Sequence, residues 1–187
     1  MGGTVTAGPE GAPPAGRRAL LDACVLYPTV LRQILLRCAG LYTPLWSPRI
    51  LEEWARAAAR EGVEAVARGE IALLRARFPG AEVTPGPTEA LQLPDPGDLH
   101  VLAAAIAGRA DDIVTLNLRD FPARALGPIR AVHPDDFLMA LWLAAPSEVE
   151  AAVAAERAET ERISGRDQPL RALLKRARLP RLGKALG

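Results

Sequence analysis

Four acidic residues, Asp22, Glu53, Asp98 and Asp120, stand where chemistry is expected in an alternating α/β protein. Asp22 and Asp120 follow predicted strands, Glu53 lies one turn into a predicted helix, and Asp98 begins another. Ligands of such folds bind beyond the carboxyl ends of parallel strands, so we expect the four acids to gather there. Gathered carboxylates repel one another unless a divalent cation, most simply Mg²⁺, neutralises them. The pattern therefore predicts a metal-dependent nuclease.

Each acid also has a structural interpretation. Asp98 could be a helix N-cap, Asp120 could form an Asx turn, and Glu53 could be surface charge beside Glu52. Asp22 is harder to explain in this way, because an acid that directly ends a buried strand is costly to desolvate unless something compensates its charge. A metal ion is the simplest such partner.

The elements that must position these acids alternate along the chain. Strands are predicted at 18–22, 41–46, 113–116 and 129–132, with a further short one at 81–84. Helices are predicted from 28 to 38, from 47 onward, and over 63–78, 98–108 and 134–143. The alternation predicts a three-layer α/β/α fold around a central, mainly parallel sheet. Beyond Pro146 we expect a helix over 148–163 and a shorter basic helix or tail over 169–186, broken by Pro180.

Composition divides the chain into three parts. Residues 1–16 form a Gly/Pro/Ala-rich leader that is expected to be disordered, 17–144 the α/β domain, and 145–187 a helical, basic C-terminal extension. Residues 1–165 carry 16 Arg against 21 Asp and Glu, whereas 166–187 carry five Arg and two Lys against one Asp. A basic end on an acidic body suggests nucleic-acid contact, and a solvated terminus is the alternative. The candidate contact residues are Arg171, Lys175, Arg176 and Arg178.

Location is also constrained by composition. No apolar run approaches the roughly 20 residues that a membrane helix needs. The leader lacks the apolar segment of a signal peptide, and Cys24 and Cys38 do not have metal-ligand spacing. We therefore expect reduced thiols, a cytoplasmic location and no membrane contact.

The segments around the four acids resemble a known family. They are Leu-Leu-Asp-Ala-Cys-Val-Leu-Tyr-Pro at 20–28, Ser-Pro-Arg-Ile-Leu-Glu-Glu-Trp at 47–54, Leu-Pro-Asp-Pro-Gly-Asp-Leu-His-Val-Leu-Ala-Ala-Ala at 93–105 and Val-Thr-Leu-Asn-Leu-Arg-Asp-Phe-Pro at 114–122. Together they look like the four acidic motifs of the PIN domain, most closely of the branch that includes bacterial VapC-type toxins. The resemblance covers residues 17–144 in the family's order and spacing, and the combination is more specific than any one motif.

The resemblance implies a PIN-like fold, Mg²⁺ or Mn²⁺ binding, and cleavage of single-stranded RNA. It assigns the four motif acids to Asp22, Glu53, Asp98 and Asp120, which are the implied catalytic and metal-binding residues. The implied supporting residues are Asp95, Thr115 and Asn117. A cognate antitoxin and a homodimer are also implied. The basic extension departs from the minimal family pattern, which puts the usual arrangement of partners in question.

A metal-activated water would need no covalent nucleophile, which suits a chain whose His100 and His133 form no triad. We expect His100 to be a structural histidine, although it could sit near the site. Three tryptophans, Trp46, Trp54 and Trp142, could stack bases, but the last two have helical-core spacing.

Other enzyme classes fit less well. A haloacid-dehalogenase-type phosphatase would have an Asp where Cys24 stands, and a receiver domain would have a lysine after a late strand, whereas both lysines lie in the basic extension. There is no Gly-rich phosphate loop followed by lysine. A non-catalytic PIN-like module that binds RNA or protein, and a housekeeping RNA-processing nuclease, remain as alternatives.

Overall fold

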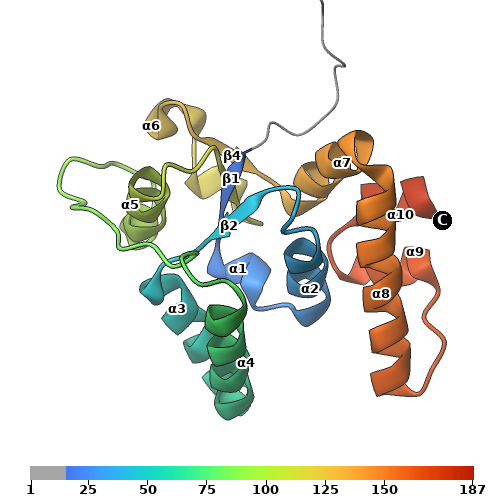
Figure 1. The fold of residues 1–187 in the computed structure, drawn as a ribbon. Helices are drawn as coiled ribbons and strands as arrows, with labels where there is room; N and C mark the ends of the chain where they lie inside the picture. The colour runs from blue at the N-terminus through green and yellow to red at the C-terminus, as the bar shows by residue number, and fades with distance from the viewer. Residues whose placement is uncertain (1–15) are drawn as a thin grey trace, which may run out of the picture.

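The computed structural model describes residues 16–187, and it places helices on both sides of one small sheet (Figure 1). The predicted leader lies almost entirely outside the described residues. The sheet has the order β2-β1-β3-β4, and every pair of neighbouring strands is parallel. Its strands are β1 (Arg18–Leu21), β2 (Thr43–Leu45), β3 (Asp112–Val114) and β4 (Arg130–Val132). The predicted α/β fold with a parallel sheet is confirmed.

Helices connect the strands, as parallel pairing requires. They are α1 (Ala23–Leu26), α2 (Thr29–Arg37), α3 (Pro48–Arg60), α4 (Glu64–Arg77), α5 (Leu99–Ala107), α6 (Ala123–Leu126) and α7 (Pro134–Ala144), with the 3-10 turns η1 (Pro96–Asp98) and η2 (Leu118–Asp120). The extension consists of α8 (Pro146–Ser164), α9 (Leu170–Arg176) and α10 (Pro180–Leu186). Figure 1 shows α5 on one side of the sheet and α7 with the extension on the other.

Two local predictions differ from the structure. The predicted strand over 81–84 is reduced to a single bridge between Trp46 and Glu82, because the Pro/Gly-rich stretch that follows cannot continue a ladder. Pro28 is the N-cap of α2 and not its first helical residue, so the helix begins one residue later than expected, at Thr29. The predicted break at Pro180 is present: α9 ends before it, and Pro180 begins α10, since proline suits the first turn, where its missing N–H costs nothing.

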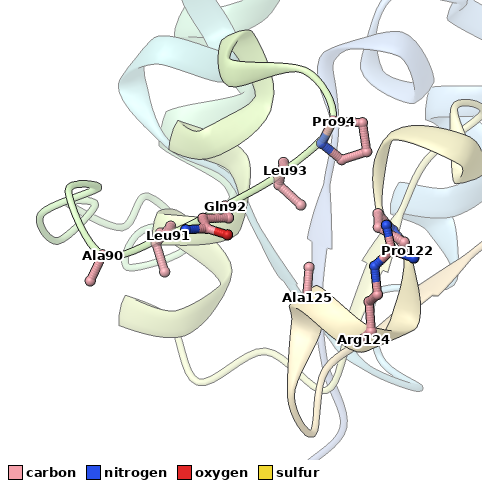
Figure 2. A pocket seen from close by; sticks show the side chains of 8 residues that line it. All are labelled: Ala90, Leu91, Gln92, Leu93, Pro94, Pro122, Arg124 and Ala125. Atoms are coloured by element: carbon pink, nitrogen blue, oxygen red, sulfur yellow. The ribbon is translucent and has the colours of Figure 1, made fainter.

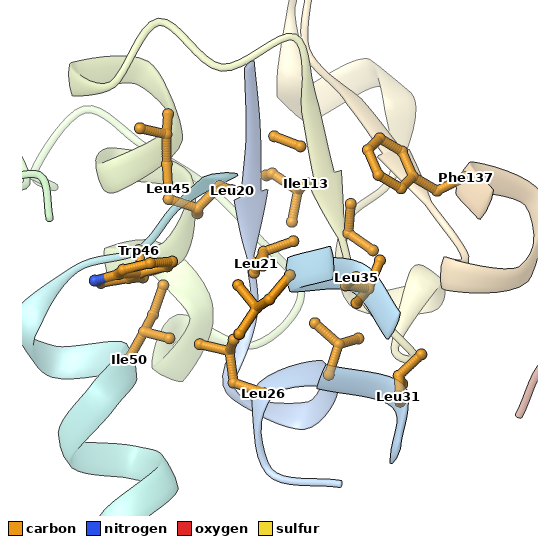
Figure 3. Close-up of a cluster of buried hydrophobic side chains, with 14 of the residues drawn as sticks. Leu20, Leu21, Leu26, Leu31, Leu35, Leu45, Trp46, Ile50, Ile113 and Phe137 are labelled. Atoms are coloured by element: carbon orange, nitrogen blue, oxygen red, sulfur yellow. The ribbon is translucent and has the colours of Figure 1, made fainter. Parts of the chain in front are cut away.

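The core lies around the two central strands. Leu20, Leu21 and Ile113 are fully buried there, and Figure 3 shows them beside Phe137 of α7. Trp46 and Trp54 are buried as well, so neither can stack on a base in this conformation. Trp142 is half-buried and donates its indole N–H to Glu150 Oε1 at 3.0 Å.

The extension is packed on the rest of the chain and is not a free tail. Helix α8 lies against α2 and α7, and α10 lies against α7 and α9. The buried carboxylate of Asp135 on α7 accepts the backbone N–H groups of Arg181 at 2.8 Å and Leu182 at 3.0 Å, which caps α10. Buried leucines at 173, 174, 179 and 182 secure the two short helices. The basic residues of this segment therefore sit on a folded element.

Candidate active site

Asp22 is the most buried acid of the predicted set. It directly follows β1, donates its backbone N–H to Val114 O at 3.1 Å, and leaves only 6% of its surface exposed. Its Oδ2 accepts hydrogen bonds from Thr115 Oγ1 at 2.7 Å and Cys24 Sγ at 3.1 Å, and its Oδ1 accepts the Ala23 N–H at 2.6 Å. These hydrogen bonds offset part of the cost of burying the Asp22 carboxylate, a cost that we expected a metal ion to offset.

The side-chain donors that hold Asp22 come from the segments that follow the two central strands: Cys24 is in α1, after β1, and Thr115 follows β3. Cys24 accepts the Leu116 N–H at 3.2 Å while its own thiol points to Asp22, and Thr115 Oγ1 accepts the Asn117 N–H at 3.1 Å. Burial raises the pKa of the Cys24 thiol to about 12, and the negative charge of Asp22 contributes. The thiol therefore stays protonated and can donate. This role of Cys24 was not predicted from the sequence. The only signal was the position of its thiol, two residues after Asp22.

Asp98 stands at the junction of η1 and α5. It occupies the N-cap position of α5, but its side chain accepts no capping hydrogen bond. Its pKa is raised from the ordinary 3.8 to about 6, chiefly by burial and then by the charges of Asp22, Asp95 and Asp120, whereas the charge of His100 lowers it. The structure thus brings four of the predicted carboxylates within electrostatic reach of one another.

Asp95 and Asp120 lie nearer to solvent than Asp22. Asp95 is exposed, and its Oδ1 accepts the Gly97 N–H at 2.7 Å, so it shapes the turn before Asp98. Asp120 belongs to η2, keeps 20% of its side-chain surface exposed, and lies 3.6 Å from the Nε of Arg119. Both acids therefore remain accessible to solvent.

Glu53 reaches this group through a histidine. Its Oε1 lies 2.8 Å from Nε2 of the buried His100 and 3.5 Å from Nε of Arg49. The short distance to His100 does not have hydrogen-bond geometry, and both ring nitrogens lack a well-aligned partner within residues 16–187. The charge of His100 also lowers the pKa of Asp98. His100 therefore links Glu53 to the other acids at the first turn of α5.

Comparison with known proteins decides the family. The model of the PIN domain matches residues 18–119, which include three of the four acids and the donors that hold Asp22. This chain belongs to the PIN-domain family. A stretch of 44 residues is 61% identical to the "Putative ribonuclease VapC50" of Mycobacterium tuberculosis (strain ATCC 25618 / H37Rv). That stretch covers 22% of this chain and 26% of the relative, and no solved structure gives a significant match.

The acids of this PIN domain do not by themselves form a complete metal site in the described part of the chain. Across residues 16–187, no three His, Cys, Asp or Glu side chains converge closely enough to hold an ion by themselves. Mg²⁺ commonly binds through one or two carboxylates and retains several waters. Carboxylate oxygens that crowd one another, as around Asp98, fit such a hard and partly hydrated cation.

The candidate RNA-binding residues of the extension lie apart from the acids. Arg171, Lys175, Arg176 and Arg178 are all exposed. Arg176 donates to Gln168 Oε1 at 2.6 Å. They belong to the α9–α10 region, across the sheet from α5 (Figure 1). Within residues 16–187, no helix of the PIN domain or its extension is long and apolar enough to span a bilayer.

Proposed function

We propose that this PIN-domain protein is an endoribonuclease that uses Mg²⁺ or Mn²⁺ to cleave single-stranded RNA. The observation that carries the proposal is that Asp98 lies within electrostatic reach of Asp22 and Asp120, whose charges, together with burial as the larger cause, raise the pKa of Asp98. Mutual repulsion of this kind has no structural benefit, but it disappears when a cation binds. The ribonuclease name of the partial relative agrees with this chemistry.

The proposed ligands of the metal are Asp22, Glu53, Asp98 and Asp120. A bound ion would neutralise them, activate a water and stabilise the leaving oxygen of the phosphodiester. The chain's own contribution is to hold the carboxylates in place: Thr115 and Cys24 fix Asp22, and His100 lies beside Glu53. Asp95 and Asn117 are proposed as supporting residues, since they shape the turns on which Asp98 and Asp120 stand.

Cleavage of a single-stranded RNA oligonucleotide tests the proposal directly. The purified protein should cut it with Mg²⁺ or Mn²⁺, EDTA should stop the reaction, and Asp22→Asn should abolish it while the fold persists, since the change deletes charge and little volume. Glu89→Gln, which removes an exposed acid without an ion pair among the described residues, is the matched control. An Asp22→Asn protein as active as Glu89→Gln would refute the assignment.

We further propose that the protein is the cytoplasmic toxin of a toxin–antitoxin pair, works as a homodimer, and is held inactive by a small antitoxin. This rests on the VapC-type resemblance and on the name of the partial relative. Expression alone should slow cell growth, and co-expression with the neighbouring open reading frame should restore it and yield a complex on gel filtration. If the protein cuts RNA but neither slows growth nor binds the product of the neighbouring open reading frame, it would instead be a housekeeping nuclease.

The extension, residues 145–187, is proposed as a separate functional part whose exposed basic residues contact RNA or the antitoxin. Its support is the surplus of positive charge, which stays on the surface while the leucines of the same helices are buried. Binding experiments on charge-neutralised variants test it, as described below.

A further inference from the structure

A groove of about 610 Å³ runs beside the acids, between the segment 90–94 and the start of α6 (Figure 2). Both walls continue directly into candidate acids: Pro94 precedes Asp95, and Pro122 follows Asp120 by two positions. The groove therefore opens next to the place where the scissile phosphate would lie. Its volume is within the range of pockets that bind small organic ligands.

One wall of the groove carries an uncompensated cation. Arg124 of α6 lines it, is exposed, and forms no ion pair or side-chain hydrogen bond with any residue in 16–187. Most arginines near the surface of this protein are paired; Arg68 and Arg157, for example, each contact two carboxylates. An exposed and unpaired guanidinium is suited to a phosphate, which it can contact through two N–H groups.

The opposite wall presents free backbone groups at a fixed position. Leu91 and Leu93 are half-buried against the core, which anchors the segment. The N–H groups of Gln92 and Leu93 donate no hydrogen bond to the described part of the chain, and Figure 2 shows the segment running along the groove. Fixed backbone donors and acceptors can read the edges of unstacked bases, which is how single-stranded RNA is commonly recognised.

We propose that this groove binds the nucleotide next to the scissile phosphate of a single-stranded RNA, with Arg124 on a backbone phosphate and the segment 90–94 along the base. The proposal rests on the ribonuclease function proposed above and names a binding site for its substrate. A phosphodiester strand is favoured over a peptide, because the groove combines an unpaired cation with walls that continue along the chain into Asp95 and lead back to Asp120.

Binding of a fluorescent single-stranded RNA oligonucleotide to Arg124→Gln tests the proposal, in an Asp22→Asn background that prevents cleavage. We expect the Kd to rise about fivefold to tenfold and the slope of log K against log salt to fall by about 0.7, the value for one lost phosphate contact on a single strand. Arg124→Lys should retain the slope. The matched control is Arg60→Gln, since Arg60 is exposed at the end of α3 and has no ion pair in the described chain.

The outcomes separate the two proposals. If the protein binds RNA through Arg124 but does not cut it with either metal, the ribonuclease function fails and the groove stands only as an RNA-binding site. If the protein cuts RNA but Arg124→Gln matches Arg60→Gln in Kd and salt slope, the groove does not bind RNA. Unchanged RNA binding with weakened binding of the antitoxin would overturn the proposal as well, and would assign the groove to a protein.

Discussion

Replacing Asp98 with asparagine should stabilise the metal-free protein at neutral and alkaline pH. The Asp98 carboxyl titrates at about 6 in the folded chain, compared with an ordinary value of 3.8. One pKa unit corresponds to about 1.36 kcal/mol, so the full difference sets a ceiling of about 3 kcal/mol. Because Asp98 is half-exposed, solvent screening reduces the usable figure to about 1–2 kcal/mol.

The pH dependence has a definite sign. A carboxyl whose folded pKa is raised destabilises the fold when it is charged, so the cost is fully present above pH 6 and disappears as the pH falls below about 4. Asparagine has no such charge, and Asp98 accepts no capping hydrogen bond that the change would remove. At pH 8 in EDTA, Asp98→Asn should therefore melt about 2–8 °C above the unmodified protein. At pH 4 most of this difference should be gone.

Thermal melts in EDTA at both pH values, with Glu89→Gln as the charge-removal control, measure this effect. Added Mn²⁺ should stabilise the unmodified protein by mass action and Asp98→Asn much less, which would reverse their order. The electrostatic explanation is wrong if Asp98→Asn is no more stable than the control at pH 8. It is equally wrong if the gain is as large at pH 4.

Three further predictions follow from hydrogen bonds and burial. Cys24→Ala removes a donor to Asp22 and should lower kcat for RNA cleavage about tenfold, whereas Cys24→Ser should largely retain it. Asp135→Ala leaves two N–H groups of α10 without an acceptor and should cost about 2–3 kcal/mol in urea unfolding. Deleting 166–187 should lower the melting temperature, because it exposes apolar surface on α7 and α8. Replacing the four exposed basic residues with glutamine should leave the melting temperature unchanged but flatten the salt dependence of RNA binding. Those four are Arg171, Lys175, Arg176 and Arg178.

Much of the fold could be predicted because strands and helices here have strong local signals. The buried run of β1, the Ser47 cap of α3 and the Gly108 end of α5 lie where the sequence places them. The packing of α9 and α10 could not be predicted, since their buried leucines have meaning only against α7. Charge alone suggested a loose basic tail, and the carboxylate of Asp135 that anchors it looked like an ordinary residue in the first turn of a helix.

Part of the candidate site could likewise be predicted from the sequence, and part of it could not. The meeting of Asp22 with Thr115 was foreseeable, because parallel neighbouring strands end at the same edge of a sheet. The contact of Glu53 with His100 joins α3 to α5, and no pattern in either helix predicts it. The role of the Cys24 thiol could not be predicted either, since its hydrogen bonds depend on where β3 ends.

The order of synthesis gives the parallel sheet a kinetic consequence. The hydrogen bond between Asp22 and Thr115 joins residues 93 positions apart, and β1 can pair with β3 only after residue 112 has left the ribosome. Such non-local pairing forms late, because a long loop must close, at an entropic cost, before the paired strands can make stabilising contacts. A nascent chain that has reached α4 carries Asp22 and Glu53 but no assembled cluster of acids. Any activity of the acids is therefore withheld until translation has passed β3, and products of interrupted synthesis before that point are inert.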